Sequence, residues 1–202
     1  MDVHVIIDHP RKSSFNHAVL ESFTAGVRAA GHFPDILDLC DDAFEPGISQ
    51  AELSAYSGGY STDPKVSEYQ ERLSSAGYLA MVFPVWWSFM PSRMKGWMDK
   101  VFRPGFAMTT GIEPKPLLGH INGATVLTTS GSPDTVIREA SDNGLYGALC
   151  KGALGFCGIS PTEWLNFGGT GVVPREEHAQ WLDTVYEHAR SLNYETGPEA
   201  PG

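Results

Sequence analysis

The chain has 202 residues, of which 42% are hydrophobic, and this suits one domain with a full-sized core. Its formal net charge of -10 argues against a basic nucleic-acid-binding surface and against attachment to anionic lipid. No apolar run approaches the roughly 18 to 20 residues of a membrane span, and the N-terminus lacks the features of a signal peptide. We therefore expect a single cytoplasmic domain over residues 1–202, with a frayed tail at 193–202 and no membrane insertion.

The cysteine pattern points to free thiols. Cys40, Cys150 and Cys157 are an odd number and contain no C-x-x-C spacing. Neither a disulfide framework nor a metal site is supported by this pattern. We expect reduced, buried cysteines and no metal.

Strand-like and helix-like segments alternate along the whole chain. Short β-branched or continuous apolar runs predict strands, and apolar stripes at helical spacing predict helices. In chain order, the predicted elements are a strand at 3–7, a helix at 15–30, a strand at 32–39, an irregular stretch at 41–64, a helix at 65–75, a strand at 78–83, a helix at 92–102 with Ser92 as a candidate N-cap, a loop at 103–120, a strand at 124–129, a helix at 145–156, a strand at 162–167 and a helix at 174–192 with Pro174 at its first position.

Such alternation predicts an α/β fold. Parallel strands joined by right-handed helical crossovers place helices on both faces of a doubly wound sheet. Five strands fit the flavodoxin-like order 2-1-3-4-5. In sheets of this kind a ligand lies beyond the carboxyl ends of the strands, beside strands 1 and 3.

The loop after the first strand, Asp8 to Asn16, carries features of a phosphate site. Ser13 and Ser14 precede a helix start, where backbone amides and the helix dipole favour an anion. His9, Arg11 and Lys12 offer further donors. An ordinary helix cap beside a basic surface loop is the alternative.

The loops after the third and fourth strands add an aromatic wall and a small-residue turn. In FPVWWSFMP, residues 83–91, Trp86 and Trp87 form a possible platform for a flat ring; packing under a loop or in a dimer interface is the alternative. In TTSGSP, residues 128–133, small residues allow close backbone approach, or form a plain turn. A phosphate cradle and a flat polar ring together describe flavin mononucleotide (FMN) or the flavin half of FAD.

The motifs HPxxSSFN, FPVWWSFMPSRMKGWMDKVFxPGFAM and TTSG resemble the NAD(P)H:quinone oxidoreductase family of flavodoxin-like flavoproteins. The resemblance runs over most of residues 3–190. It implies substrate-pocket roles for Phe106, Ala107 and Met108, and treats 95–99 as helix packing. The cofactor-binding positions that it implies are His9, Ser13, Ser14, Phe15, Asn16, Pro84, Val85, Trp86, Trp87, Ser88, Thr128, Thr129, Ser130 and Gly131.

The chain departs from that family in two places. Mammalian-type members carry a Tyr and a His beyond the TTGG loop, whereas this stretch has no His and only the late Tyr146, so we assign no catalytic residue. Ser130 stands where the family has a glycine, so it must adopt the glycine's dihedral angles unless the loop differs. The compact 41–64 stretch favours FMN over FAD, and the choice between NADH and NADPH stays open.

By resemblance, the expected activity is a two-electron, ping-pong reduction of a quinone or similar flat acceptor by NAD(P)H. Backbone donors near 129–131 are expected to stabilise negative charge on the reduced ring. A homodimer is expected from the family. The alternatives are a flavodoxin-type electron carrier and a regulatory flavoprotein subunit of a transporter.

Overall fold

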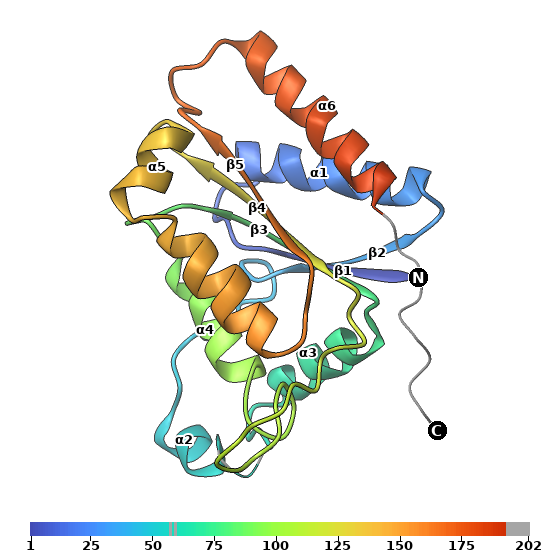
Figure 1. Ribbon diagram of the computed structural model, residues 1–202, viewed down its shortest axis with the longest axis vertical. Helices are drawn as coiled ribbons and strands as arrows, with labels where there is room; N and C mark the ends of the chain where they lie inside the picture. The colour runs from blue at the N-terminus through green and yellow to red at the C-terminus, as the bar shows by residue number, and fades with distance from the viewer. Residues whose placement is uncertain (57, 59, 193–202) are drawn as a thin grey trace.

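A computed structural model describes residues 1–56, 58 and 60–192 (Figure 1). Its five strands form one parallel sheet in the order β2-β1-β3-β4-β5, which confirms the predicted fold class. The predicted frayed tail lies outside the described residues. The strands are β1 (Asp2–Ile7), β2 (Phe33–Asp38), β3 (Tyr78–Pro84), β4 (Ala124–Ser130) and β5 (Thr162–Gly168). The helices are α1 (Phe15–Ala29), α2 (Gln50–Tyr56), α3 (Pro64–Ser75), α4 (Ser92–Val101), α5 (Asp134–Ala140), the π-helix η1 (Tyr146–Leu154) and α6 (Arg175–Ser191).

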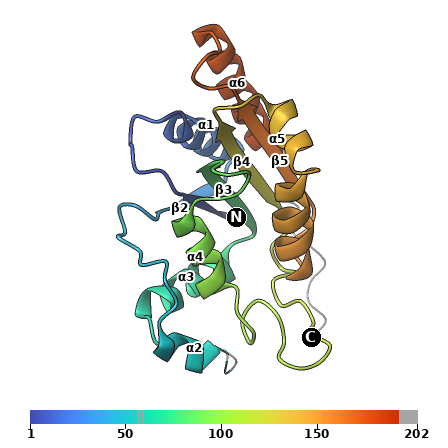
Figure 2. The same cartoon turned by 90° about the vertical axis from the view of Figure 1, so that its left-hand side faces the viewer.

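Helices cover both faces of the sheet. Helices α1 and α6 lie together on one face, and α3, α4 and η1 lie on the other, as two perpendicular views show (Figures 1 and 2). Alternate residues of β1 divide between the two cores: Val5 packs with α1 and α6, and Ile6 packs with α3 and α4. Because both faces are covered, every residue of β3 is buried, as its continuous apolar sequence predicts.

Close contact between α1 and α6 depends on a small residue. A Cβ atom added at Gly26 would lie 2.4 Å from the backbone oxygen of Tyr186. No side chain fits at that distance, so glycine sets the spacing of these two helices. The two helices pack closely together and cover one face of the sheet. Because the strands are parallel, their carboxyl ends all lie along one edge of the sheet.

Buried charges hold the stretch 41–64 against α4. The Lys100 ammonium is 1% exposed and lies 3.1 Å from a Glu52 oxygen and 2.8 Å from an Asp63 oxygen. Glu52 belongs to the short helix α2, and Asp63 caps α3 by accepting the amide hydrogen of Lys65. This stretch therefore packs against α4, and Figures 1 and 2 place α2 at the end of the molecule opposite α6.

Several sequence expectations need correction. The stretch 41–64 is not wholly irregular, because it contains α2, and α5 was not predicted. Helix α5 buries none of its residues, so it has no apolar stripe to detect. The helix expected at 145–156 is largely π-helical, and Ser92 lies inside α4 with Pro91 as the preceding cap residue. Pro174 likewise caps α6 instead of occupying its first position. Among the described residues, no helix has the length and apolarity needed to cross a membrane.

Candidate functional site

The loops after β1, β3 and β4 meet at the carboxyl edge of the sheet, and Thr129 links them. The Asn16 side-chain amide donates to the Thr129 hydroxyl at 2.8 Å, although the two residues are 113 positions apart. The Val85 amide donates to the Thr129 carbonyl at 2.7 Å. The structure therefore brings together the phosphate-like loop, the aromatic loop and the small-residue loop.

The first turn of α1 leaves hydrogen-bonding groups open for a ligand. Ser14 is the N-cap and its hydroxyl accepts the amide hydrogen of His17. The amides of Phe15 and Asn16 precede any carbonyl that could accept them within the helix. Asn16 is 2% exposed, and its side-chain oxygen has no hydrogen-bond partner among the described residues. A buried amide oxygen of this kind needs a donor, such as a ligand hydroxyl.

The other polar residues of this loop are placed less favourably for an anion. Lys12 is engaged by Asp38 and Asp41, with both nitrogen-to-oxygen distances at 2.5 Å. The His9 ring accepts the Arg11 amide hydrogen at 3.0 Å, and burial lowers the pKa of His9, so its ring is neutral at pH 7. Ser13 and Arg11 are exposed. An anion at this loop would therefore meet the helix amides more readily than Lys12 or His9.

The aromatic loop is a tight turn with a strained backbone. Trp86 and Phe89 exchange two backbone hydrogen bonds of 2.9 and 3.0 Å. Between them Trp87 and Ser88 have positive φ angles of 51° and 61°, the pattern of a type I′ turn. Gly and Asn suit these positions, and a bulky residue there is an outlier that often marks a functional site.

This turn presents Trp87 to solvent. Its side chain is fully exposed, and Trp86 is 49% exposed. Packing beneath a loop of the same chain is thereby excluded for Trp87. An indole ring held out in solvent by a strained turn is suited to contact a flat ligand.

The small-residue loop differs from the sequence expectation in its backbone. Ser130 is the last residue of β4, so its extended conformation suits any residue and no glycine-like angle is needed. Its hydroxyl donates to the Ser132 carbonyl at 2.8 Å. Gly131 is exposed, and a Cβ atom there would have nothing within 4 Å. Open space beside Gly131 lets a flat group approach the backbone closely.

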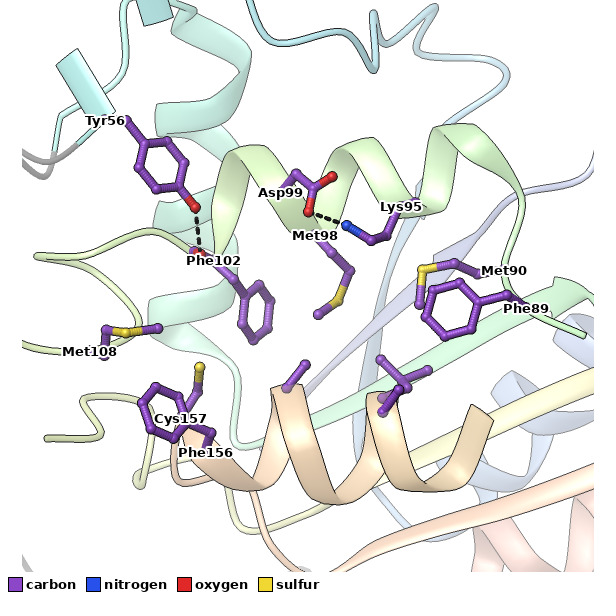
Figure 3. A pocket seen from close by; sticks show the side chains of 13 residues that line it. Tyr56, Phe89, Met90, Lys95, Met98, Asp99, Phe102, Met108, Phe156 and Cys157 are labelled. Carbon is purple, nitrogen blue, oxygen red and sulfur yellow. Dashed lines mark hydrogen bonds and ion pairs between the residues drawn. The ribbon is translucent and has the colours of Figure 1, made fainter. Parts of the chain in front are cut away.

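An apolar pocket of about 330 Å³ lies between α4 and η1 (Figure 3). Phe89 and Met90, which follow the aromatic turn, bound one end, and Tyr56 and Met108 bound the other. Burial raises the pKa of Cys157 to about 11, so its thiol is neutral. We call this cavity the α4–η1 pocket; its lining residues are Tyr56, Phe89, Met90, Lys95, Met98, Asp99, Phe102, Met108, Ala148, Leu149, Ala153, Phe156 and Cys157.

The three expected substrate-pocket residues lie in different environments. Met108 lines the α4–η1 pocket, Ala107 is completely buried, and Phe106 lines a separate surface hollow beside α3. Sequence reasoning assigned no role to Phe89 or Met90, although both belong to the motif that drew attention to the tryptophans. Lys95 and Asp99 form an ion pair along α4 at the rim of the pocket.

Relatives that are similar in sequence are named as an NAD(P)H dehydrogenase and an NAD(P)H oxidoreductase. NAD(P)H dehydrogenase (quinone) 1 of Cavia porcellus is 26% identical over 206 residues, which is 88% of this chain and 72% of that protein. An uncharacterized NAD(P)H oxidoreductase of Haemophilus influenzae is 26% identical over 166 residues, covering 81% of this chain and 82% of that protein.

Solved structures agree with the fold. The NAD(P)H:quinone oxidoreductase from Methanothermobacter marburgensis has a TM-score of 0.86 and 28% identity, and the match covers 96% of this chain and 99% of that one. An FMN-dependent NADH-azoreductase from Bacillus anthracis, solved with FMN, has a TM-score of 0.76 at 23% identity, covering 94% and 98% of the two chains. The family model described as the flavodoxin-like fold matches residues 1–192. The chain therefore belongs to the family of proteins with the flavodoxin-like fold.

Proposed function

We propose that this protein is an FMN-dependent oxidoreductase that uses NAD(P)H to reduce a quinone or a similar flat acceptor. The observation that carries the proposal is Trp87, a fully exposed indole held by a strained turn, in a loop that Val85 and Thr129 link to Asn16 in the first turn of α1. The two relatives named as quinone reductases, one by sequence and one by structure, support the same chemistry.

The carboxyl edge of the sheet fits FMN in three respects. The amides of Phe15 and Asn16 suit the phosphate, because helix N-termini favour anions. The orphaned, buried oxygen of Asn16 suits a donor such as a ribityl hydroxyl. The indole of Trp87 and the open space at Gly131 suit the flat ring and its polar edge.

The position of 41–64 supports FMN over FAD. Lys100 holds this stretch against α4 through Glu52 and Asp63, and α2 lies far from the carboxyl edge (Figure 1). The stretch 41–64 packs against α4, so it is not placed to cover the adenosine group of FAD at the carboxyl edge.

Bound FMN would supply the capacity to take a hydride from NAD(P)H and to give two electrons to an acceptor. The protein's part is orientation and electrostatics. The turn around Trp87 would hold the ring, and the exposed Gly131 would present its backbone to the polar edge, supported from the end of β4 by the buried Thr128, Thr129 and Ser130. Pro84 ends β3, Val85 joins it to the turn and bonds to Thr129, and Ser88 is a central residue of the turn. No side chain is assigned to acid–base chemistry.

The acceptor is proposed to be small, apolar and flat. The α4–η1 pocket has the volume of a small-ligand site, and aromatic and methionine side chains dominate its lining. We propose that NAD(P)H and the acceptor use the same face in turn, which is a ping-pong order. A single-electron carrier has less use for such a pocket, so the carrier and regulatory alternatives rank second.

Assembly and location are part of the proposal. Phe156 on the rim of the pocket is 49% exposed, and with Trp86 and Trp87 it supports burial against a second copy in a homodimer. Light scattering of the purified protein measures its molecular mass in solution and so distinguishes a monomer from a dimer. All three cysteines are free, which supports the reducing cytoplasm as the location.

Titration with FMN tests the binding, and initial rates test the order. The tryptophan emission of the apoprotein should fall on addition of FMN, and double-reciprocal plots against NAD(P)H at several quinone concentrations should be parallel. Unchanged emission together with no retained flavin would remove the proposal. Intersecting plots would keep the activity and reject the ping-pong order.

A further inference from the structure

A closed circuit of side chains lies directly behind the Thr128–Gly131 loop. The Trp164 indole donates to the Thr128 hydroxyl at 2.8 Å, and this hydroxyl donates to the Asn166 oxygen at 2.8 Å. The Asn166 nitrogen donates to an Asp134 oxygen at 2.9 Å, and the other Asp134 oxygen accepts from Arg138 at 2.7 Å. The Arg138 guanidinium lies 4.1 Å from the centre of the Trp164 ring, which closes the circuit.

Asn166 is the centre of this circuit. Its oxygen accepts one hydrogen bond, and its nitrogen donates both hydrogens, to Asp134 at 2.9 Å and to the Ser130 hydroxyl at 3.3 Å. Turning the amide over would point its oxygen at the Asp134 carboxylate, so the orientation shown is the one that the contacts allow. Neither an aspartate nor an alanine reproduces this set of bonds.

The circuit ties β5 to the carboxyl end of β4, directly before the loop that starts at Gly131. Through Asn166, β5 holds both Thr128 and Ser130, the first and third residues of the TTSG motif. The Ser130 carbonyl is also fixed, because the Thr170 amide and hydroxyl donate to it at 3.1 and 3.3 Å. Thr128 is completely buried, so loss of its acceptor would leave the hydroxyl hydrogen without a partner in the core.

We infer that Asn166 is a positioning residue that fixes the Thr128–Gly131 loop against the polar edge of the FMN ring. The inference rests on the proposed function, because FMN is the ligand that the loop would meet. Asn166 acts through Thr128 and Ser130 rather than by touching the reacting atoms. Asp134 and Arg138 serve the same purpose by fixing the orientation of the Asn166 amide.

Three variants and one control separate positioning from general stability. Asn166→Ala removes every bond of the amide, and Asn166→Asp places a second carboxylate beside Asp134. The exchange Asn166→Asp with Asp134→Asn restores a hydrogen bond between the two positions in the opposite direction. Thr125→Val is the control, because it breaks a buried hydroxyl network with Tyr78 and His188 near the end of β4 opposite to Thr128 and Ser130.

The Kd for FMN, the midpoint potential of bound FMN and the urea midpoint of the apoprotein are measured for each variant. Asn166→Ala and Asn166→Asp should raise the Kd about tenfold or more, and the exchange should recover part of that loss. A loosened edge should weaken binding of reduced FMN more than oxidised FMN. A tenfold difference between the two forms lowers a two-electron potential by about 30 mV. Thr125→Val should lower the urea midpoint and leave Kd and potential unchanged.

Unchanged Kd and potential in Asn166→Ala, in a wild-type protein that does bind FMN, would overturn the inference and leave the proposed function intact. Equal effects from Thr125→Val would also overturn it, because general destabilisation would then explain the loss. If Asn166→Ala does not fold, absence of any recovery in the exchange variant relative to Asn166→Asp decides against it. A wild-type protein that binds no FMN removes the proposed function and this inference together.

Discussion

Trp87→Gly is expected to make the apoprotein more stable and to weaken its hold on FMN. A non-glycine residue in the left-handed region costs roughly 1–2 kcal/mol, and the φ angle of Trp87 is 51°. Glycine relieves that strain, but its greater conformational freedom in the unfolded chain lowers the free energy of unfolding by about 0.4–1 kcal/mol. The Trp87 side chain is fully exposed, so its removal forfeits no burial within the chain. The net gain is about 0.5–1 kcal/mol, a rise in Tm of about 1–4 °C.

The loss of the indole should appear in the affinity. Aromatic ring contacts contribute about 0.5–1.5 kcal/mol beyond the area that they bury, so the Kd for FMN should rise at least 2- to 10-fold. Urea unfolding of the apoprotein and fluorescence titration with FMN measure the two effects separately. Ser88→Gly is the matched control: it relieves the same kind of strain at φ 61° and keeps the indole, so its Kd should change less.

Two results would refute this reasoning. A Trp87→Gly apoprotein that is less stable by more than about 1 kcal/mol would mean that the indole packs within the fold, against its full exposure. An unchanged Kd would mean that Trp87 is not the platform for the ring.

Three further predictions concern the site, its pH dependence and the fold. Asn16→Ala should raise the Kd for FMN about tenfold in the same titration, because it removes the buried amide oxygen and the bond to Thr129. Burial lowers the pKa of His188 from 6.5, so the unfolded chain takes up its proton first as the pH falls and the free energy of unfolding decreases below pH 6.5; urea titrations should show this, with a smaller decrease in His188→Gln. Lys100→Met leaves Glu52 and Asp63 without their buried cation and should lower the free energy of unfolding by about 3–5 kcal/mol in urea titrations. A decrease under about 1 kcal/mol would contradict the role of Lys100 in holding 41–64 against α4.

The sheet was predictable because its signals are local. β3 is a continuous apolar run that is buried along its whole length, and the stripe of α1 ends at Gly31, whose φ is 81°. The alternation of strands with helices predicted a parallel sheet, and five such strands fit the flavodoxin-like order. The meeting of the three loops followed in turn, because the carboxyl ends of parallel strands share one edge.

Other features depend on tertiary contacts that no local pattern reveals. Helix α2 has seven residues and is anchored by Glu52 to Lys100, which lies 48 positions away by residue number. The positive φ angles at Trp87 and Ser88 oppose the preferences of both residue types, so the surrounding structure imposes them. Asn166 meets Asp134 across 32 positions, and an asparagine inside a strand gives no sign of that partner.

The π-helix η1 has a partial signal in the sequence. The triplet Gly-Ala-Leu occurs at 147–149 and again at 152–154, a spacing of five residues. A Cβ atom at Gly152 would lie 3.1 Å from the Gly147 carbonyl oxygen, in line with the i to i+5 bonding of a π-helix. A five-residue repeat of small residues is thus compatible with the wider helix that lines the α4–η1 pocket.

Anaerobic stopped-flow reduction of the FMN-loaded protein by NADH and by NADPH tests the central claim most directly. The account predicts rapid bleaching of the flavin absorbance with at least one donor and its return on addition of a quinone. A colourless protein that binds no added FMN would contradict the assignment of the carboxyl edge as a flavin site. A flavin-loaded protein that stays oxidised with both donors would contradict the reductase activity and favour an electron carrier or regulatory subunit.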